Sequence, residues 1–69
     1  MLFTIRQARV HAGLTQEEVA KALNIDRTTY RKIEKDPDRA TLNQIREIAA
    51  ATGISAEKIF LAENSTKVE

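Results

Sequence analysis

Apolar residues recur along most of the chain at intervals of three or four positions, which is the spacing of one face of an α-helix. No segment sustains the apolar–polar alternation of a half-buried strand. Bounded by cap and turn residues, this pattern predicts an all-α fold, a compact bundle of five helices. The predicted helices lie at residues 4–12, 16–23, 27–35, 42–52 and 56–61.

The predicted helix starts carry capping signals. In a capping box, a Thr is followed three residues later by Gln or Glu, and each side chain satisfies a free backbone amide of the other residue. Three such boxes precede apolar residues at helical spacing: Thr4-x-x-Gln7, Thr15-x-x-Glu18 and Thr41-x-x-Gln44. Asp26 and Ser55 match simple N-caps before the third and fifth segments.

The predicted helix ends agree with these starts. Gly13, Asn24 and Gly53 follow the first, second and fourth segments, and both residue types tolerate the left-handed conformation that ends many helices. Pro37 follows the third segment and cannot continue a helix. Helices and joints together therefore account for residues 1–61 as one domain, while residues 62–69 lack an apolar face and are predicted to form a flexible tail.

The predicted core uses nearly every large apolar residue, which leaves little for a buried ligand pocket. Its members are Ile5, Ala8, Leu14, Val19, Ala20, Leu23, Ile25, Tyr30, Ile33, Leu42, Ile45, Ile48, Ala49, Ile54, Ile59 and Phe60.

Composition narrows the chemistry. The 69 residues suffice for one small domain, and the net charge is only +1, so any electrostatic function depends on how charge is distributed. There is no cysteine and only one histidine, His11, so neither a disulfide nor a metal site is expected. The absence of cysteine fits a reducing cytoplasm, which is the expected location. No apolar run approaches a membrane span, and "MLFTI" is too short for a signal peptide, so no membrane partner is expected.

The third helix gathers cations on one side. In a helical projection at about 100° per residue, one sector of roughly 140° around the helix axis contains no acidic residue. That face consists of Arg27, Thr28, Arg31, Lys32 and Lys35. Like charges at i,i+4 repel, and an anionic partner would relieve that cost. A solvated surface is the alternative interpretation.

The neighbouring residues favour a nucleic-acid partner. Only Asn24 to Asp26 join the second and third helices, and the small Ala20 permits a close crossing between them. Gln16 starts the second helix, where a free helix N-terminus attracts phosphate. This arrangement predicts a helix-turn-helix whose second member turns its cationic face outward.

The segment "GLTQEEVAKALNIDRTTYRKIE" resembles the core of lambda-repressor-like, Cro/XRE-type helix-turn-helix DNA-binding domains. The resemblance runs from about Ile5 to Phe60. It includes the "R-x-x-x-G-L-T-Q" lead-in at residues 9–16 and the closing "A-x-x-x-G-I-S-x-x-x-I-F" at residues 49–60.

This resemblance implies a five-helix bundle whose third helix enters the major groove. It places Arg27 and Thr28 where the family reads base edges, and Arg31 and Lys32 one turn further on. It also implies DNA-backbone contacts from Gln16, Lys35 and Arg39, and an internal ion pair between Arg9 and Glu34.

Some positions depart from the family pattern. Asn24 replaces a more usual Gly, and "E-K-D" at residues 34–36 replaces a common "E-N-G". Asp36 and Asp38 bring negative charge into a loop expected near phosphates, which makes Arg39 a weaker candidate than Arg27. Tyr30 is expected in the core, with a phosphate contact from its hydroxyl as the alternative.

The sequence therefore predicts a sequence-specific, double-stranded-DNA-binding transcriptional regulator of phage-repressor type. A homodimer on DNA is possible, with Leu61 as a candidate self-contact. The alternative is an antitoxin or another protein-interaction module that uses the same fold to hold a protein partner. Enzymatic activity and a cofactor are not expected, because Glu18 is explained as a cap and Glu34 as an ion-pair partner.

Overall fold

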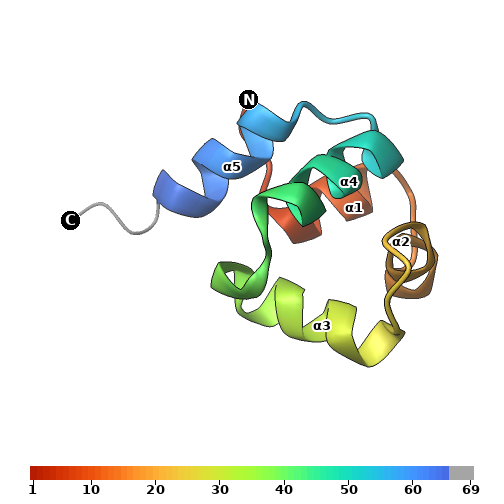
Figure 1. Cartoon of the computed structure of the whole chain (residues 1–69). Coiled ribbons are helices and arrows are strands. Elements are labelled where there is room, and N and C mark those ends of the chain that lie inside the picture. Colours follow the sequence, from red (N-terminus) through yellow and green to blue (C-terminus); the bar gives the residue numbers. More distant parts are fainter. Residues whose placement is uncertain (66–69) are drawn as a thin grey trace.

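The structure is a computed structural model and describes residues 1–65. Within them the chain forms five α-helices, one short 3₁₀-helix and no β-strand, so the predicted all-α, five-helix fold is confirmed (Figure 1). Four of the helices begin and end within one residue of the predicted bounds. The elements are α1 (Ile5–His11), α2 (Gln16–Ala22), α3 (Arg27–Lys35), η1 (Pro37–Arg39), α4 (Leu42–Thr52) and α5 (Ala56–Ser65).

All three predicted capping boxes are present. The hydroxyl oxygens of Thr4, Thr15 and Thr41 accept hydrogen bonds of 3.0–3.1 Å from the amide three residues on. The Gln or Glu side chain at that position accepts the Thr amide in return, at 2.8–2.9 Å. Asp26 caps α3, because its carboxylate accepts the Thr29 amide at 2.7 Å. The starts of α1 to α4 are thus fixed by local chemistry.

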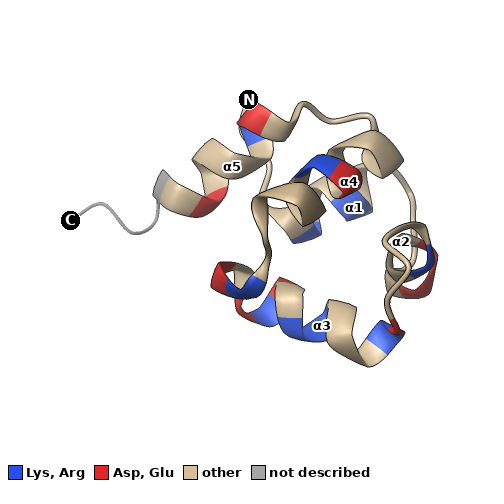
Figure 2. Ribbon diagram, in the orientation of Figure 1, with Lys and Arg blue, Asp and Glu red and all other residues tan. Residues whose placement is uncertain are grey.

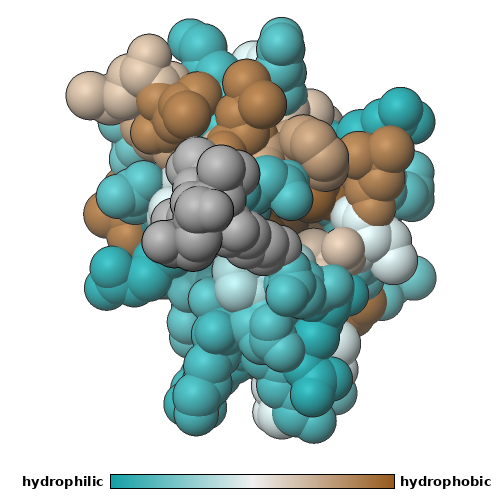
Figure 3. All heavy atoms as spheres, turned by 90° about the vertical axis from the view of Figure 1, so that its left-hand side faces the viewer, coloured by the Kyte–Doolittle hydropathy of each residue, from teal (hydrophilic) through white to brown (hydrophobic). Residues whose placement is uncertain are grey.

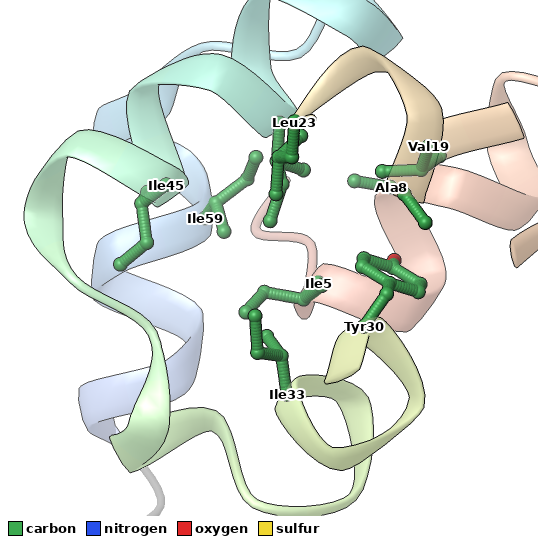
Figure 4. Close-up of a cluster of buried hydrophobic side chains, with 10 residues drawn as sticks. Ile5, Ala8, Val19, Leu23, Tyr30, Ile33, Ile45 and Ile59 are labelled. Carbon is green, nitrogen blue, oxygen red and sulfur yellow. The ribbon is translucent and has the colours of Figure 1, made fainter. Parts of the chain in front are cut away.

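Ten buried side chains from all five helices form the core. Figure 4 shows them converging between the helices. They are Ile5, Ala8, Val19, Ala20, Leu23, Tyr30, Ile33, Ile45, Ile48 and Ile59. Helices α2 and α3 pack against each other, while α4 packs against α1, α2 and α5. The core therefore holds α3 by one face only.

Two predicted core residues are exposed instead. Leu42 is 52% exposed and Phe60 is 44% exposed. Leu42 is the first residue of α4, and Phe60 follows the fully buried Ile59, so its side chain points about 100° away from the core. Conversely, Phe3 packs against the core and Ala62 is only 7% exposed, although neither was predicted there.

The fifth helix is longer than predicted. It continues to residue 65 rather than ending at 61, so the prediction of a tail is wrong for residues 62–65, and residues 66–69 lie outside the described part. Ala62 is buried, and the Glu63 carboxylate accepts the Ile5 amide at 2.6 Å. That amide lies in the first turn of α1 and has no partner within its own helix, so the contact ties the end of α5 to the start of α1.

Candidate nucleic-acid interface

The turn between α2 and α3 is closed by two backbone hydrogen bonds. Asn24 has φ 59° and donates its amide to the Lys21 carbonyl at 3.0 Å, while Ile25 donates to the Ala20 carbonyl at 3.0 Å. This is the Schellman pattern, in which a left-handed residue ends a helix and the following apolar residue packs inward. Ile25 packs against the core and Ala20 is 2% exposed, so the crossing of α2 and α3 is close and fixed.

Helix α3 has a packed face and an open face. Tyr30 and Ile33 are buried, whereas Arg27, Thr28, Arg31, Lys32 and Lys35 are all exposed. Figure 2 shows that blue, cationic segments recur along α3. None of these cations forms an ion pair with another residue of the described range 1–65. The described residues therefore leave these positive charges without an ion-pair partner.

A surface groove of about 420 Å³ runs beside α3 and brings most of the predicted contact residues together. Its lining consists of Arg6, Gln16, Thr28, Arg31, Lys32, Glu34 and Lys35. Arg27 instead borders a smaller groove of about 290 Å³ near the start of α2, with Thr15, Gln16 and Glu17. Arg39 lines neither groove.

A partly buried hydrogen-bond network lies beneath the open face of α3. The Glu34 carboxylate accepts Arg9 Nε at 2.5 Å, the Tyr30 hydroxyl at 2.5 Å and Gln16 Nε2 at 3.1 Å. The Arg9 and Glu34 side chains are only 13% and 5% exposed. Arg9 Nη1 also donates to the Leu14 carbonyl at 2.9 Å. The network joins α1, α2 and α3, and it contains the ion pair that the family resemblance implies.

This network fixes the ionisation of its members. Burial raises the pKa of Glu34, but the hydrogen bonds from Arg9, Tyr30 and Gln16 and the charge of Arg9 lower it further, so its pKa lies below the usual range. The hydrogen bond to Glu34 in turn raises the pKa of Arg9. Glu34 is therefore a carboxylate at neutral pH, and the adjacent guanidinium of Arg9 balances its charge.

Tyr30 serves the core rather than the surface. Its side chain is fully buried, and burial followed by the hydrogen bond to Glu34 raises the pKa of its hydroxyl. Because that hydroxyl donates inward at 2.5 Å, the alternative of a phosphate contact from Tyr30 does not fit this geometry.

Arg39 has a local partner, Asp36, that no sequence pattern predicted. Its Nε lies 3.6 Å from Asp36 Oδ2, and both side chains are more than half exposed. An exposed pair of this kind contributes little to stability, but it lowers the local positive charge of η1.

In residues 1–65 no group of three or more His, Cys, Asp or Glu side chains is placed to hold a metal ion. No helix of that range is long and apolar enough to cross a membrane.

The close crossing of α2 and α3, with the open face of α3 cationic, defines a helix-turn-helix domain. A family model described as "Helix-turn-helix" matches residues 5–59. The chain belongs to this family, the Cro/C1-type helix-turn-helix proteins, and the resemblance noted in the sequence is confirmed.

One curated relative is a "Neisseria hypothetical transcription factor" from Neisseria meningitidis serogroup B. It is 33% identical over 61 residues, which make up 88% of this chain and 58% of the relative. The chain thus spans a little more than half the length of that protein. No solved structure is a significant match.

Proposed function

We propose that this chain is a sequence-specific regulator of transcription that binds double-stranded DNA and inserts α3 into the major groove. The observation that carries this proposal is the row of exposed cations on α3, which form no ion pair within residues 1–65 and are held outward by the helix-turn-helix. The major groove of B-DNA admits an α-helix, and its phosphates supply the anionic partner that the row lacks. Membership of the helix-turn-helix family and the name of the curated relative support the same function.

The open face of α3 divides by role in this proposal. Arg27 and Thr28 lie at its start and contact base edges, where an arginine can form two hydrogen bonds to one guanine. Arg31 and Lys32 lie one turn further on and contact bases or the adjoining backbone. Base contacts set the sequence preference, whereas phosphate contacts set affinity and register.

Backbone contacts come from residues around this helix. Gln16 is held by its bond to Glu34 at the edge of the larger groove, and Lys35 lines the same groove. Both fit phosphate contacts. Arg39 is the weakest member of this group, because Asp36 already lies 3.6 Å from its guanidinium. Arg9 and Glu34 keep a structural role.

We assign the protein to the repressor type because of its resemblance to phage-repressor domains. A small domain in the major groove can block other proteins from the same DNA by occupying it. Transcription in vitro tests this assignment, from a promoter that carries a DNA site selected by the protein from random duplex DNA. The expected result is less transcript as protein is added; more transcript would indicate an activator.

A protein partner is the second candidate function, and one observation favours it. A surface groove of about 400 Å³ borders α1 on the side of the chain's first residues, and several of its members are exposed and apolar. Its lining consists of Met1, Leu2, Phe3, Arg6, Gln7, Val10 and His11. An antitoxin-like module could hold its partner there.

Selection from a pool of random duplex DNA separates the two functions. The expected result is enrichment of a defined sequence by the parent protein and loss of enrichment by the double variant R27Q/R31Q. Both side chains are exposed, so the double variant should keep the helical circular dichroism of the parent. Absence of enrichment by the parent, at low salt and high protein concentration, would contradict DNA recognition and favour the protein-partner function.

A further inference from the structure

The groove beside α3 includes a cation from outside the helix-turn-helix. Arg6 belongs to α1, is exposed and forms no ion pair with any other residue in the described range. It nevertheless lines the same groove as Arg31, Lys32 and Lys35 of α3. Every DNA contact predicted from the sequence lies on α2, α3 or the segment that follows α3.

Charge in this groove is unbalanced. Four of its lining residues are cationic, and its one acid is Glu34. The Glu34 carboxylate is occupied by three residues that donate to it, and Arg9 already balances its charge. The four cations therefore line one groove without an ion pair to any acid of the described residues, and a bound phosphate would relieve their mutual repulsion.

The groove also offers suitable donors. A guanidinium presents several N–H groups in a planar fork that matches phosphate oxygens. Gln16 and Thr28 add an amide and a hydroxyl to the same lining. Charged and neutral donors from three helices thus border one space, which is a common arrangement around a DNA backbone phosphate.

We propose that a phosphate of the DNA backbone occupies the groove between α1 and α3, and that Arg6 contacts it. This inference rests on the proposed DNA-binding function and adds α1 to the interface. Because a phosphate is present at every nucleotide, the Arg6 contact strengthens binding and fixes the position of the domain without changing its base preference.

The salt dependence of binding tests this contact. The logarithm of the binding constant falls with the logarithm of salt concentration by about 0.9 for each phosphate that is neutralised. For R6Q, we expect the slope on the selected DNA site to be about 0.9 smaller in magnitude for each protomer bound, with unchanged preference among sites. R6K should keep the slope of the parent. K35Q should reduce the magnitude of the slope by about as much as R6Q does.

Arg46 supplies the matched control. It is exposed on α4 and lines none of the grooves beside α1 and α3, so R46Q makes the same change in net charge away from the interface. We expect R46Q to leave the slope unchanged. Ethylation interference should also show a phosphate in the selected DNA site at which modification weakens binding by the parent but not by R6Q.

The possible failures are distinct. If the parent binds no duplex DNA, both the proposed function and the Arg6 contact are contradicted. If the parent binds its site and R6Q has the same slope and the same interference pattern, only the Arg6 contact is overturned. Equal losses in R6Q and R46Q would also overturn it, because they would reflect net charge rather than a contact.

Discussion

Single residues of α3 divide between folding and binding. Tyr30 and Ile33 are buried and hold the helix, whereas Arg27 is exposed and has no ion-pair partner among the described residues. A change at Arg27 should therefore alter binding without unfolding the domain. The reverse holds for Glu34, whose carboxylate joins three helices.

We expect Arg27→Ala to weaken specific DNA binding and to relax the preference at one or two base positions. A bidentate arginine–guanine pair provides about 1–3 kcal/mol of discrimination, or roughly 5- to 150-fold. Binding to a panel of single-base variants of the selected site measures this effect. Arg46→Ala is the control and should leave the panel unchanged. A panel pattern for Arg27→Ala identical to that of the parent would exclude Arg27 from base reading.

We expect Glu34→Gln to lower the free energy of unfolding at pH 7 by about 1–3 kcal/mol, because it removes the charged acceptor from Arg9. The pKa of Glu34 is lower in the folded state than its ordinary value of about 4.3. The stability from this carboxylate is therefore present above that value and is lost as pH falls through the folded pKa. Urea unfolding at several pH values between about 7 and 3 should show that the free energy of unfolding decreases less with acidification in the variant than in the parent.

Asp26 provides the control for this titration. Hydrogen bonds from the Thr29 side chain and amide lower its pKa, so it contributes to the acid loss in the same direction. Asp26→Asn keeps a good N-cap but does not titrate. Comparing it with the parent therefore measures the part of the stability loss on acidification that comes from Asp26. If Glu34→Gln lost as much stability on acidification as the parent, the network would not be the source of the acid sensitivity.

The sequence predicted the exposed cations and, through the family resemblance, the Arg9–Glu34 ion pair, but not the bonds from Gln16 and Tyr30 that complete the network. Arg27, Arg31, Lys32 and Lys35 follow from helical periodicity alone, because a short helix with a packed face must expose the other face. The bond between Gln16 and Glu34 joins residues 18 positions apart, so it depends on how the helices cross. Arg6 gave no periodic signal that separates it from an ordinary solvated arginine.

At the level of helices, the sequence predicted those boundaries that are set by neighbouring residues of the same helix. The capping boxes and the left-handed residues act within three or four positions, so they can be recognised without a fold. The end of α5 depends instead on a tertiary contact, since Glu63 accepts the Ile5 amide and Ala62 is buried. No local pattern distinguishes such a segment from a fraying tail.

The turn between α2 and α3 requires a left-handed residue at position 24. Asn24 has φ 59°, which is costly for most side chains and easiest for Gly. We expect Asn24→Val to lower the free energy of unfolding by about 1–2 kcal/mol and Asn24→Gly to change it by less than about 0.5 kcal/mol. Urea unfolding monitored by circular dichroism measures both changes.

Ala50 provides the comparison for Asn24→Gly, because it lies inside a helix, where glycine is unfavourable. It is exposed within α4, where Gly costs about 1 kcal/mol relative to Ala. Ala50→Gly should therefore destabilise the domain while Asn24→Gly does not. Equal stability of Asn24→Val and the parent would mean that the turn does not need the left-handed conformation.

At the scale of the whole molecule, one face carries a group of apolar side chains toward the end opposite α3. Figure 1 places α3 at one end of the view and α5 with the chain's first residue at the other. Figure 3 shows hydrophobic atoms gathered at the upper end of one face and hydrophilic atoms below. On α5, Phe60 and Leu61 are 44% and 46% exposed. A second copy that covered these side chains would leave both α3 helices free to meet DNA.

We expect the selected DNA to contain two inverted half-sites with centres about one helical turn, roughly 34 Å, apart, because a symmetric pair of domains presents two α3 helices. The double variant F60S/L61S should still bind one half-site but should lose the added affinity of the second. Sedimentation of the protein–DNA complexes and titrations on full and half sites measure both properties. Leu42→Ser removes a similarly exposed apolar side chain from the start of α4 and should leave pairing intact. A single half-site in every selected sequence, or full pairing by F60S/L61S, would rule out a dimer formed through α5.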